Sequence, residues 1–110
     1  MKRDNKKYIE YLLRNLERLD YELTYGFKTF SLIRVLTCDE LADFKDDIFL
    51  VKEWYKNMPI FEREILTLKY EKGHLIKEIA TFTHYSESYI KEIISKQKKI
   101  LLKTINKKTS

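Results

Sequence analysis

The chain has 110 residues and a mass of 13.4 kDa, the size of one domain or of one small domain with a helical arm. Hydrophobic residues make up 44% of it and aromatic residues 14%, which is enough for a packed core and too many for a disordered chain. It has only two glycines and one proline, which argues against β-sandwiches, barrels and glycine-rich nucleotide loops. The composition therefore predicts an all-α fold.

The net charge of +5 is concentrated at one end of the chain. Residues 1–57 carry equal numbers of basic and acidic side chains, whereas residues 58–110 carry 11 basic and 6 acidic ones. Residues 86–110 alone hold seven lysines and two glutamates. A basic segment beside a balanced remainder indicates a polyanionic partner, usually nucleic acid, and the alternative is a solvated lysine-rich tail.

Several other classes are not expected from the sequence. The single cysteine, Cys38, has no partner for an internal disulfide, and no Cys/His set has zinc-ligand spacing, so we expect neither a metal nor a cofactor. The N-terminus lacks the apolar region of a signal peptide, and no 18-residue apolar run occurs. These features predict a soluble, cytoplasmic protein.

The first predicted helix spans about residues 5–24 and ends near Gly26. Its apolar residues step by three and four as in a coiled coil, and we call them the leucine seam: Ile9, Leu12, Leu16, Leu19 and Leu23. Three heptads are few for a free-standing coiled coil. The seam either forms a homodimer with a second copy or packs within the chain.

A short apolar helix or turn is predicted for residues 27–36, with Phe30, Ile33 and Leu36 as its apolar positions. Thr37 and Glu40 then have the spacing of a capping box, and Leu36 and Leu41 that of a hydrophobic staple. The helix that follows runs to about Asn57. Its apolar face comprises Leu41, Phe44, Ile48, Val51, Tyr55 and Met58.

Pro59 begins the next predicted helix, which reaches about Tyr70 and is followed by Gly73 as the C-cap. Its expected buried residues are Phe61, Ile65, Leu66 and Leu68. A helix of little more than two turns follows over residues 75–83, with apolar Ile76, Ile79, Ala80 and Phe82.

Ser86 is the N-cap of a last helix, which runs from Glu87 to about Ile105 and leaves 106–110 as a frayed tail. At 100° per residue this helix has two faces. The inner face comprises Ile90, Ile94, Gln97 and Leu101, flanked by Ile93 and Ile100. The opposite face, which we call the outer stripe, comprises Ser88, Lys91, Glu92, Ser95 and Lys99.

A short helix, a tight turn and a longer helix with a basic outer face are typical of a helix-turn-helix. We expect Ala80 to allow a close crossing of the two helices, and Tyr85 to fill the turn against Ile90.

The motifs of this second half resemble sigma-70 region 4 and fall in the same order and spacing from residue 58 to about 103. Residues 58–70, MPIFEREILTLKY, are similar to that family's L-P-x-x-x-R-E-V-L-x-L-R-Y. Residues 77–80 correspond to its E-E-I-A, Tyr85-Ser86 to its apolar-Ser turn, and Ile90-Lys91 to its V-K or I-R. The resemblance implies a helix-turn-helix that binds promoter DNA. Two positions depart from the pattern: His84 replaces the usual turn glycine, and Leu75 replaces a Ser or Thr cap.

The resemblance also implies roles for individual residues. The base-contacting residues would be Glu87, Ser88, Lys91, Glu92 and Ser95. The phosphate contacts would be Lys77, Ser86, Lys96, Lys98 and Lys99.

We therefore divide the chain into a helical N-terminal segment, 1–57, for dimerisation or partner binding, a helix-turn-helix unit, 58–105, and the tail. The N-terminal segment does not resemble sigma region 2, so the whole is similar to small transcriptional regulators of Gram-positive phages and mobile elements. The expected function is sequence-specific binding of double-stranded DNA. The alternative is a region 4 mimic that binds RNA polymerase or another host protein and has little affinity for DNA.

No enzymatic site is expected. His74 and His84 lack a carboxylate or cysteine at motif spacing, and Cys38 is interpreted as a half-buried, inert thiol. An acidic cluster without EF-hand spacing is interpreted as a solvated helix face, and the alternative is a contact with a basic protein surface: Asp39, Glu40, Asp43, Asp46 and Asp47.

Overall fold

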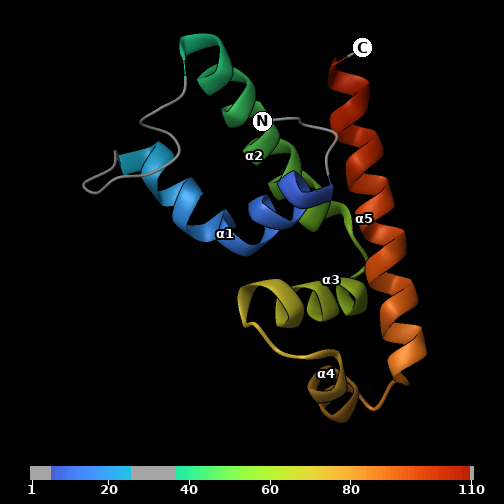
Figure 1. Cartoon of the computed structure of the whole chain (residues 1–110). Coiled ribbons are helices and arrows are strands. Elements are labelled where there is room, and N and C mark those ends of the chain that lie inside the picture. The colour runs from blue at the N-terminus through green and yellow to red at the C-terminus, as the bar shows by residue number, and fades with distance from the viewer. Residues whose placement is uncertain (1–5, 26–36, 110) are drawn as a thin grey trace.

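A computed structural model describes residues 6–25 and 37–109, and all of these residues that belong to secondary structure are helical (Figure 1). The elements are α1 (Lys6–Tyr25), α2 (Cys38–Asn57), α3 (Ile60–Leu66), the π-helical η2 (Thr67–Glu71), α4 (Ile76–Thr83) and α5 (Glu87–Thr109). The all-α prediction is confirmed. The predicted element at 27–36, with Phe30, Ile33 and Leu36, lies outside the described residues, as do the Gly26 cap and the staple between Leu36 and Leu41.

The predicted capping box at the start of α2 is confirmed. The Glu40 backbone N–H donates to Thr37 Oγ1 over 3.2 Å, and the Thr37 N–H donates to Glu40 Oε1 over 2.9 Å. The hydrogen bond from the Thr37 backbone lowers the pKa of the Glu40 carboxyl. The side chain of each residue thus accepts from the backbone N–H of the other, and two N–H groups at the helix start gain a partner.

The predicted helix from Pro59 to about Tyr70 is present, but its second half is not α-helical. Pro59 is the N-cap of α3, and in η2 the Lys72 N–H reaches the Thr67 carbonyl, five residues back, over 3.1 Å. Gly73 follows with a left-handed φ of +72°, as expected of a C-cap glycine. Tyr70 of this π-helical turn donates its hydroxyl to Glu10 of α1 over 3.0 Å.

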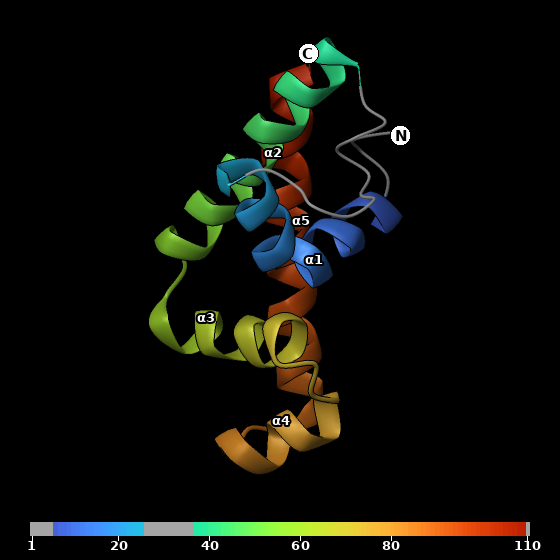
Figure 2. The same cartoon turned by 90° about the vertical axis from the view of Figure 1, so that its left-hand side faces the viewer.

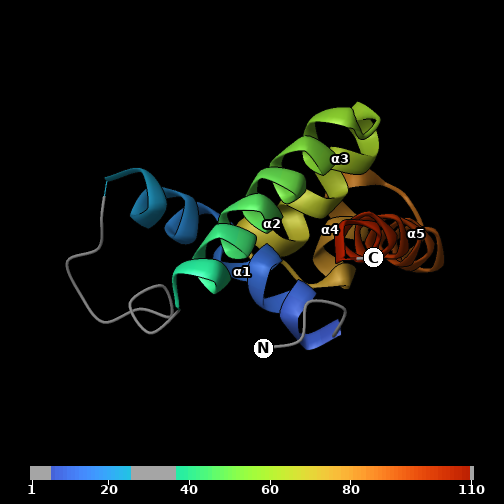
Figure 3. The same ribbon diagram turned by 90° about the horizontal axis from the view of Figure 1, so that it is seen from above.

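The molecule measures 45 × 33 × 21 Å, and α5 runs along its length (Figures 1 and 2). Seen from above, α5 lies to one side of α2, and α1 crosses beneath α2 (Figure 3). α1 contacts α2, η2 and α5, and α5 also contacts α2, α3 and α4. One core joins the two predicted parts of the chain, because it takes residues from α1 and α2 as well as from α3 to α5.

The leucine seam is buried within this core. Leu12 and Leu19 are fully buried, Ile9 and Leu16 are 2% and 9% exposed, and Leu23 packs against the same cluster. Of the two alternatives left open by the sequence, the structure has the intramolecular one. The seam is therefore not available as a dimer interface unless α1 leaves the core.

Other apolar positions lie differently from their prediction. Phe61, Phe82 and Ile100 are 40%, 55% and 45% exposed, although Phe61 and Ile100 were expected in the core. α5 continues to Thr109, so residues 106–109 are helical rather than a frayed tail. Within the described parts of the chain, no helix is both long and apolar enough to cross a lipid bilayer.

Candidate nucleic-acid interface

The helix α4 begins without a side-chain oxygen at its N-cap that could accept a hydrogen bond from its first backbone N–H groups. Leu75 occupies the N-cap position and offers no acceptor, as its apolar side chain dictates. Its backbone N–H donates to Glu78 Oε1 over 2.8 Å, so half of a capping box remains. The missing hydroxyl therefore leaves this short helix dependent on its packing against α5.

The turn between α4 and α5 depends on a histidine in an unusual conformation. His84 has a left-handed φ of 64°, and its N–H donates to the Ala80 carbonyl over 2.9 Å, closing α4. A left-handed residue at this position is the common way in which a helix ends. Ser86 then caps α5, because its Oγ accepts from the Tyr89 N–H over 3.1 Å.

Isoleucines hold the two helices together across this turn. Ile79 of α4 and Ile90 of α5 are both fully buried, and Ala80 is half-buried beside them. Tyr85 does not fill the turn as predicted: it is 39% exposed and lies against Tyr89, with ring centroids 5.0 Å apart. The buried Ile79 and Ile90 thus hold α5 against α4, and Tyr85 does not take part.

Apart from Ile100, the two faces of α5 have the exposure that their periodicity predicts. Ile90, Ile94, Gln97 and Leu101 are buried, together with Ile93 and Ile105. The five predicted base-contacting residues are all exposed: Glu87, Ser88, Lys91, Glu92 and Ser95. Of the predicted phosphate contacts, Lys77, Ser86, Lys96 and Lys99 are exposed, whereas Lys98 is only partly so.

Lys96 is exposed but tied to a buried carboxylate of α3. Glu62 is 5% exposed and accepts from Gln97 Nε2 over 2.6 Å and from Lys96 Nζ over 3.1 Å. Burial alone would raise the pKa of Glu62, but these two hydrogen bonds hold it below its ordinary value. Trp54 Nε1 donates to the Gln97 carbonyl over 3.0 Å, so the same point of α5 is also joined to α2.

Lys98 is committed to an ion pair within the protein, which argues against its predicted role as a phosphate contact. Its Nζ bonds Glu10 Oε1 of α1, the carboxylate that also accepts from the Tyr70 hydroxyl over 3.0 Å. Arg14 Nε lies 3.4 Å from the same carboxylate. Burial opposes the charged form of Lys98, yet the bond to Glu10 keeps its pKa above the ordinary lysine value. The sequence could not reveal this pair, because 88 residues separate its members.

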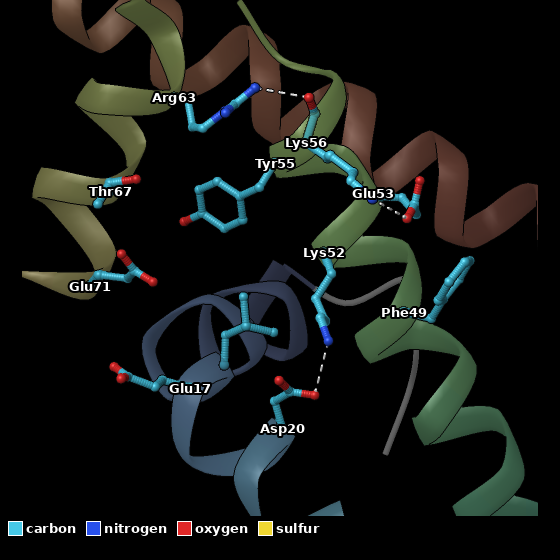
Figure 4. A pocket seen from close by; sticks show the side chains of 11 residues that line it. Glu17, Asp20, Phe49, Lys52, Glu53, Tyr55, Lys56, Arg63, Thr67 and Glu71 are labelled. Atoms are coloured by element: carbon cyan, nitrogen blue, oxygen red, sulfur yellow. Dashed lines mark hydrogen bonds and ion pairs between the residues drawn. The ribbon is translucent and has the colours of Figure 1, made fainter. Parts of the chain in front are cut away.

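A hollow of about 640 Å³ lies between α1, α2, α3 and η2 (Figure 4). It is less suited to a polyanion than the exposed face of α5 is. The described residues of its lining include four carboxylates and three cations, and these cations already have partners. Lys52 pairs with Asp20 at 3.3 Å, Lys56 with Glu53 at 4.0 Å, and Arg63 donates to the Lys56 carbonyl over 2.8 Å.

Within the described residues, His74, Cys38 and Asp47 each have surroundings of their own. His74 lies 3.6 Å from Glu78 and against the Phe82 ring, and Cys38 is exposed rather than half-buried. Asp47 is fully buried and accepts from the Tyr8 hydroxyl over 2.7 Å, so it is not part of a solvated acidic face. No cluster of potential metal ligands occurs among residues 6–25 and 37–109.

Comparisons with protein-family models, with curated proteins and with solved structures give no match. The resemblance to sigma-70 region 4 therefore rests on the motifs quoted above.

Proposed function

We propose that this protein is a sequence-specific, double-stranded DNA-binding transcriptional regulator whose last helix, over residues 87–103, enters the major groove. The proposal follows the resemblance to sigma-70 region 4 and to regulators of phages and mobile elements. It does not include a dimer through the leucine seam, because that seam lies in the core.

The observation that carries the proposal is the exposure of the outer stripe of α5 on a helix whose other face is fully anchored. Ser88, Lys91, Glu92, Ser95 and Lys99 are exposed, while Ile90 and Leu101 are buried at 0%. A helix fits the width of the major groove, so such a stripe is able to meet base edges over several base pairs.

The composition of the stripe favours contact by its N-terminal turns. Ser88 has a short side chain that permits close approach, Lys91 can donate to guanine O6 or N7, and Glu92 can accept from cytosine N4. Lys99, two turns further along, is placed to meet phosphates. Glu87 and Glu92 repel phosphates, so we expect non-specific affinity to be weak and sequence choice to matter.

Selection of bound sequences from a random duplex pool at physiological salt tests the proposal. We expect one enriched site, with affinity that falls steeply as salt rises. Lys91→Ala and Lys99→Ala should weaken binding to the enriched site, whereas Lys45→Ala, an exposed lysine of α2, should bind like wild type. A pool without enrichment, or Lys91→Ala and Lys99→Ala variants with undiminished affinity, would contradict it.

Exposed apolar side chains favour a second candidate, a region 4 mimic that binds RNA polymerase or another host protein. Leu75 and Phe82, at the two ends of α4, are 64% and 55% exposed, and Ile60 at the start of α3 is 79% exposed. Contiguous exposed apolar surface often marks protein contacts, and Leu75 and Phe82 belong to the same short helix and its cap. This candidate predicts that Phe82→Ser abolishes binding to purified RNA polymerase while Lys91→Ala leaves that binding unchanged.

A further inference from the structure

A groove beside the outer stripe has a strongly basic lining drawn from both halves of the chain. It has a volume of about 630 Å³ and lies between α1, η2, α4 and α5. Among the described residues, six basic side chains and a single carboxylate, that of Glu10, line it. The basic residues are Lys6 and Arg14 of α1, Lys69 of η2, and Lys91, Lys98 and Lys99 of α5.

The one carboxylate in the groove is already neutralised. Glu10 is bonded to Lys98 and Tyr70 and lies 3.4 Å from Arg14 Nε, and its pKa is lowered by these partners in spite of burial. The ammonium groups of Lys6, Lys69, Lys91 and Lys99 make neither hydrogen bonds nor ion pairs to the described residues, so their charge is available to a ligand. The groove therefore carries a surplus of positive charge that the fold itself does not use.

The groove is continuous with the surface proposed to meet DNA. Lys91, Ser95 and Lys99 belong to the outer stripe and also form the α5 wall of the groove. The opposite wall is formed by Lys6 and Arg14 of α1, with Lys69 of η2 beside them. An anion that leaves the outer stripe on this side thus meets a second row of cations on α1 and η2.

We propose that the groove holds a stretch of the phosphodiester backbone of the bound duplex, so that α1 and η2 form a second phosphate-binding wall. This inference rests on the proposed function and assigns Lys6 and Lys69 as phosphate contacts. The N-terminal helix then contributes to DNA affinity directly, in addition to completing the core. Three features favour a polyanion that contacts both walls, in preference to an isolated small anion. The groove is continuous with the outer stripe, four of its lysines are unpaired among the described residues, and its carboxylate is neutralised.

The test compares lysine variants on the enriched duplex over a range of salt concentrations, with folding checked by thermal unfolding. Lys6→Ala and Lys69→Ala should each weaken binding several-fold and reduce the slope of log affinity against log salt by about 0.9 per lost contact. Lys45→Ala is the matched control, since α2 contributes no residue to the groove. Lys69→Glu and Lys45→Glu extend the comparison to charge reversal. The loss of DNA affinity should be larger for Lys69→Glu than for Lys69→Ala, whereas Lys45→Glu should lose little.

Replacing single backbone phosphates by uncharged methylphosphonate identifies the contacted phosphate. At one position or more, the replacement should weaken wild-type and Lys45→Ala binding but leave Lys69→Ala unaffected, because that contact is already lost. If Lys6→Ala and Lys69→Ala both keep the wild-type affinity and salt slope while Lys91→Ala loses binding, this inference is overturned and the proposed function stands. If wild type selects no duplex, both fall together.

Discussion

The buried hydroxyl groups of Tyr8 and Tyr55 differ in their partners among the described residues: Tyr8 has a hydrogen-bond acceptor and Tyr55 has none. Tyr8 donates to the fully buried carboxylate of Asp47 over 2.7 Å and joins α1 to α2. The Tyr55 hydroxyl is buried beside the hollow of Figure 4 without a partner, and burial raises its pKa above the ordinary tyrosine value. A buried polar group without a partner costs free energy that a paired one does not.

Removal of each hydroxyl should therefore have a different effect on stability. Tyr8→Phe should lower the free energy of unfolding by about 1–3 kcal/mol, because Asp47 loses a donor in a buried position. Tyr55→Phe should be neutral or slightly stabilising, because no hydrogen bond is broken. Denaturant unfolding of the two variants beside wild type measures both values, and equal losses would contradict the assignment.

The carboxylates that hold α5 should make stability depend on pH in the acid range. The pKa values of Glu10 and Glu62 lie below the ordinary carboxyl value of 4.5 in the folded state. Their contribution is therefore complete above about pH 4.5 and is lost as the pH falls through the lower folded-state values. Glu62→Gln should be about 1 kcal/mol less stable than wild type at pH 7.

The free energy of unfolding of Glu62→Gln should fall less steeply than that of wild type below pH 4.5. The reason is that Glu10 still titrates in this variant, whereas residue 62 no longer does. Chemical denaturation from pH 7 to pH 3 measures this difference. Parallel pH profiles for wild type and Glu62→Gln would show that Glu62 titrates alike in the folded and unfolded chains.

At the scale of the elements, the turn before α5 is set by a residue that does not prefer its conformation. A left-handed φ costs an ordinary residue about 1 kcal/mol and costs a β-branched residue more, whereas glycine adopts it readily. His84→Gly should raise the free energy of unfolding by about 0.5 kcal/mol, because some of this gain is offset by the flexibility of the unfolded chain. His84→Val should lower it by about 1 kcal/mol or more.

Because the turn sets how α5 stands on α4, the two His84 variants also bear on DNA affinity. His84→Gly should keep the affinity for an enriched duplex, since the φ of 64° is retained. Unfolding curves and fluorescence anisotropy on the same preparations check both effects. A more stable His84→Val would contradict the left-handed assignment.

The elements that local sequence governs are those that could be predicted. The capping box at Thr37 and, apart from Ile100, the two faces of α5 depend on spacing along a few residues, and both are present in the structure. Periodicity could not tell whether the leucine seam packs within the chain, nor that Phe61 and Ile100 stay exposed, because that depends on where other helices lie.

The candidate site shows the same division between local and long-range information. The exposure of Lys91 and Lys99 follows from helical phase alone. The pairing of Lys98 with Glu10 and of Lys96 with Glu62 joins residues 88 and 34 positions apart. No local pattern contains such pairs, and the basic groove is likewise assembled from three separate parts of the chain.

For the molecule as a whole, α1 and α5 share one core, so the stability of each helix depends on the other. Ile9, Leu12 and Leu19 are buried in the cluster that also holds Leu101 and Ile105. The ion pair from Glu10 to Lys98 joins the same helices at the edge of the basic groove. The N-terminal segment is therefore part of the platform on which α5 stands, and its loss should expose the inner face of α5.

The intramolecular use of the leucine seam gives a test on the intact protein. Leu19→Ala should lower the free energy of unfolding by about 2–5 kcal/mol, the usual cost of a cavity at a fully buried leucine. The unfolding midpoint of wild type should be the same across a wide range of protein concentrations, because no second copy takes part in burying the seam. A homodimer through the seam would instead show a midpoint that rises with concentration, and Leu19→Ala would then convert it to a monomer without unfolding it. Denaturant titrations at several concentrations, together with sedimentation of both proteins, separate these outcomes.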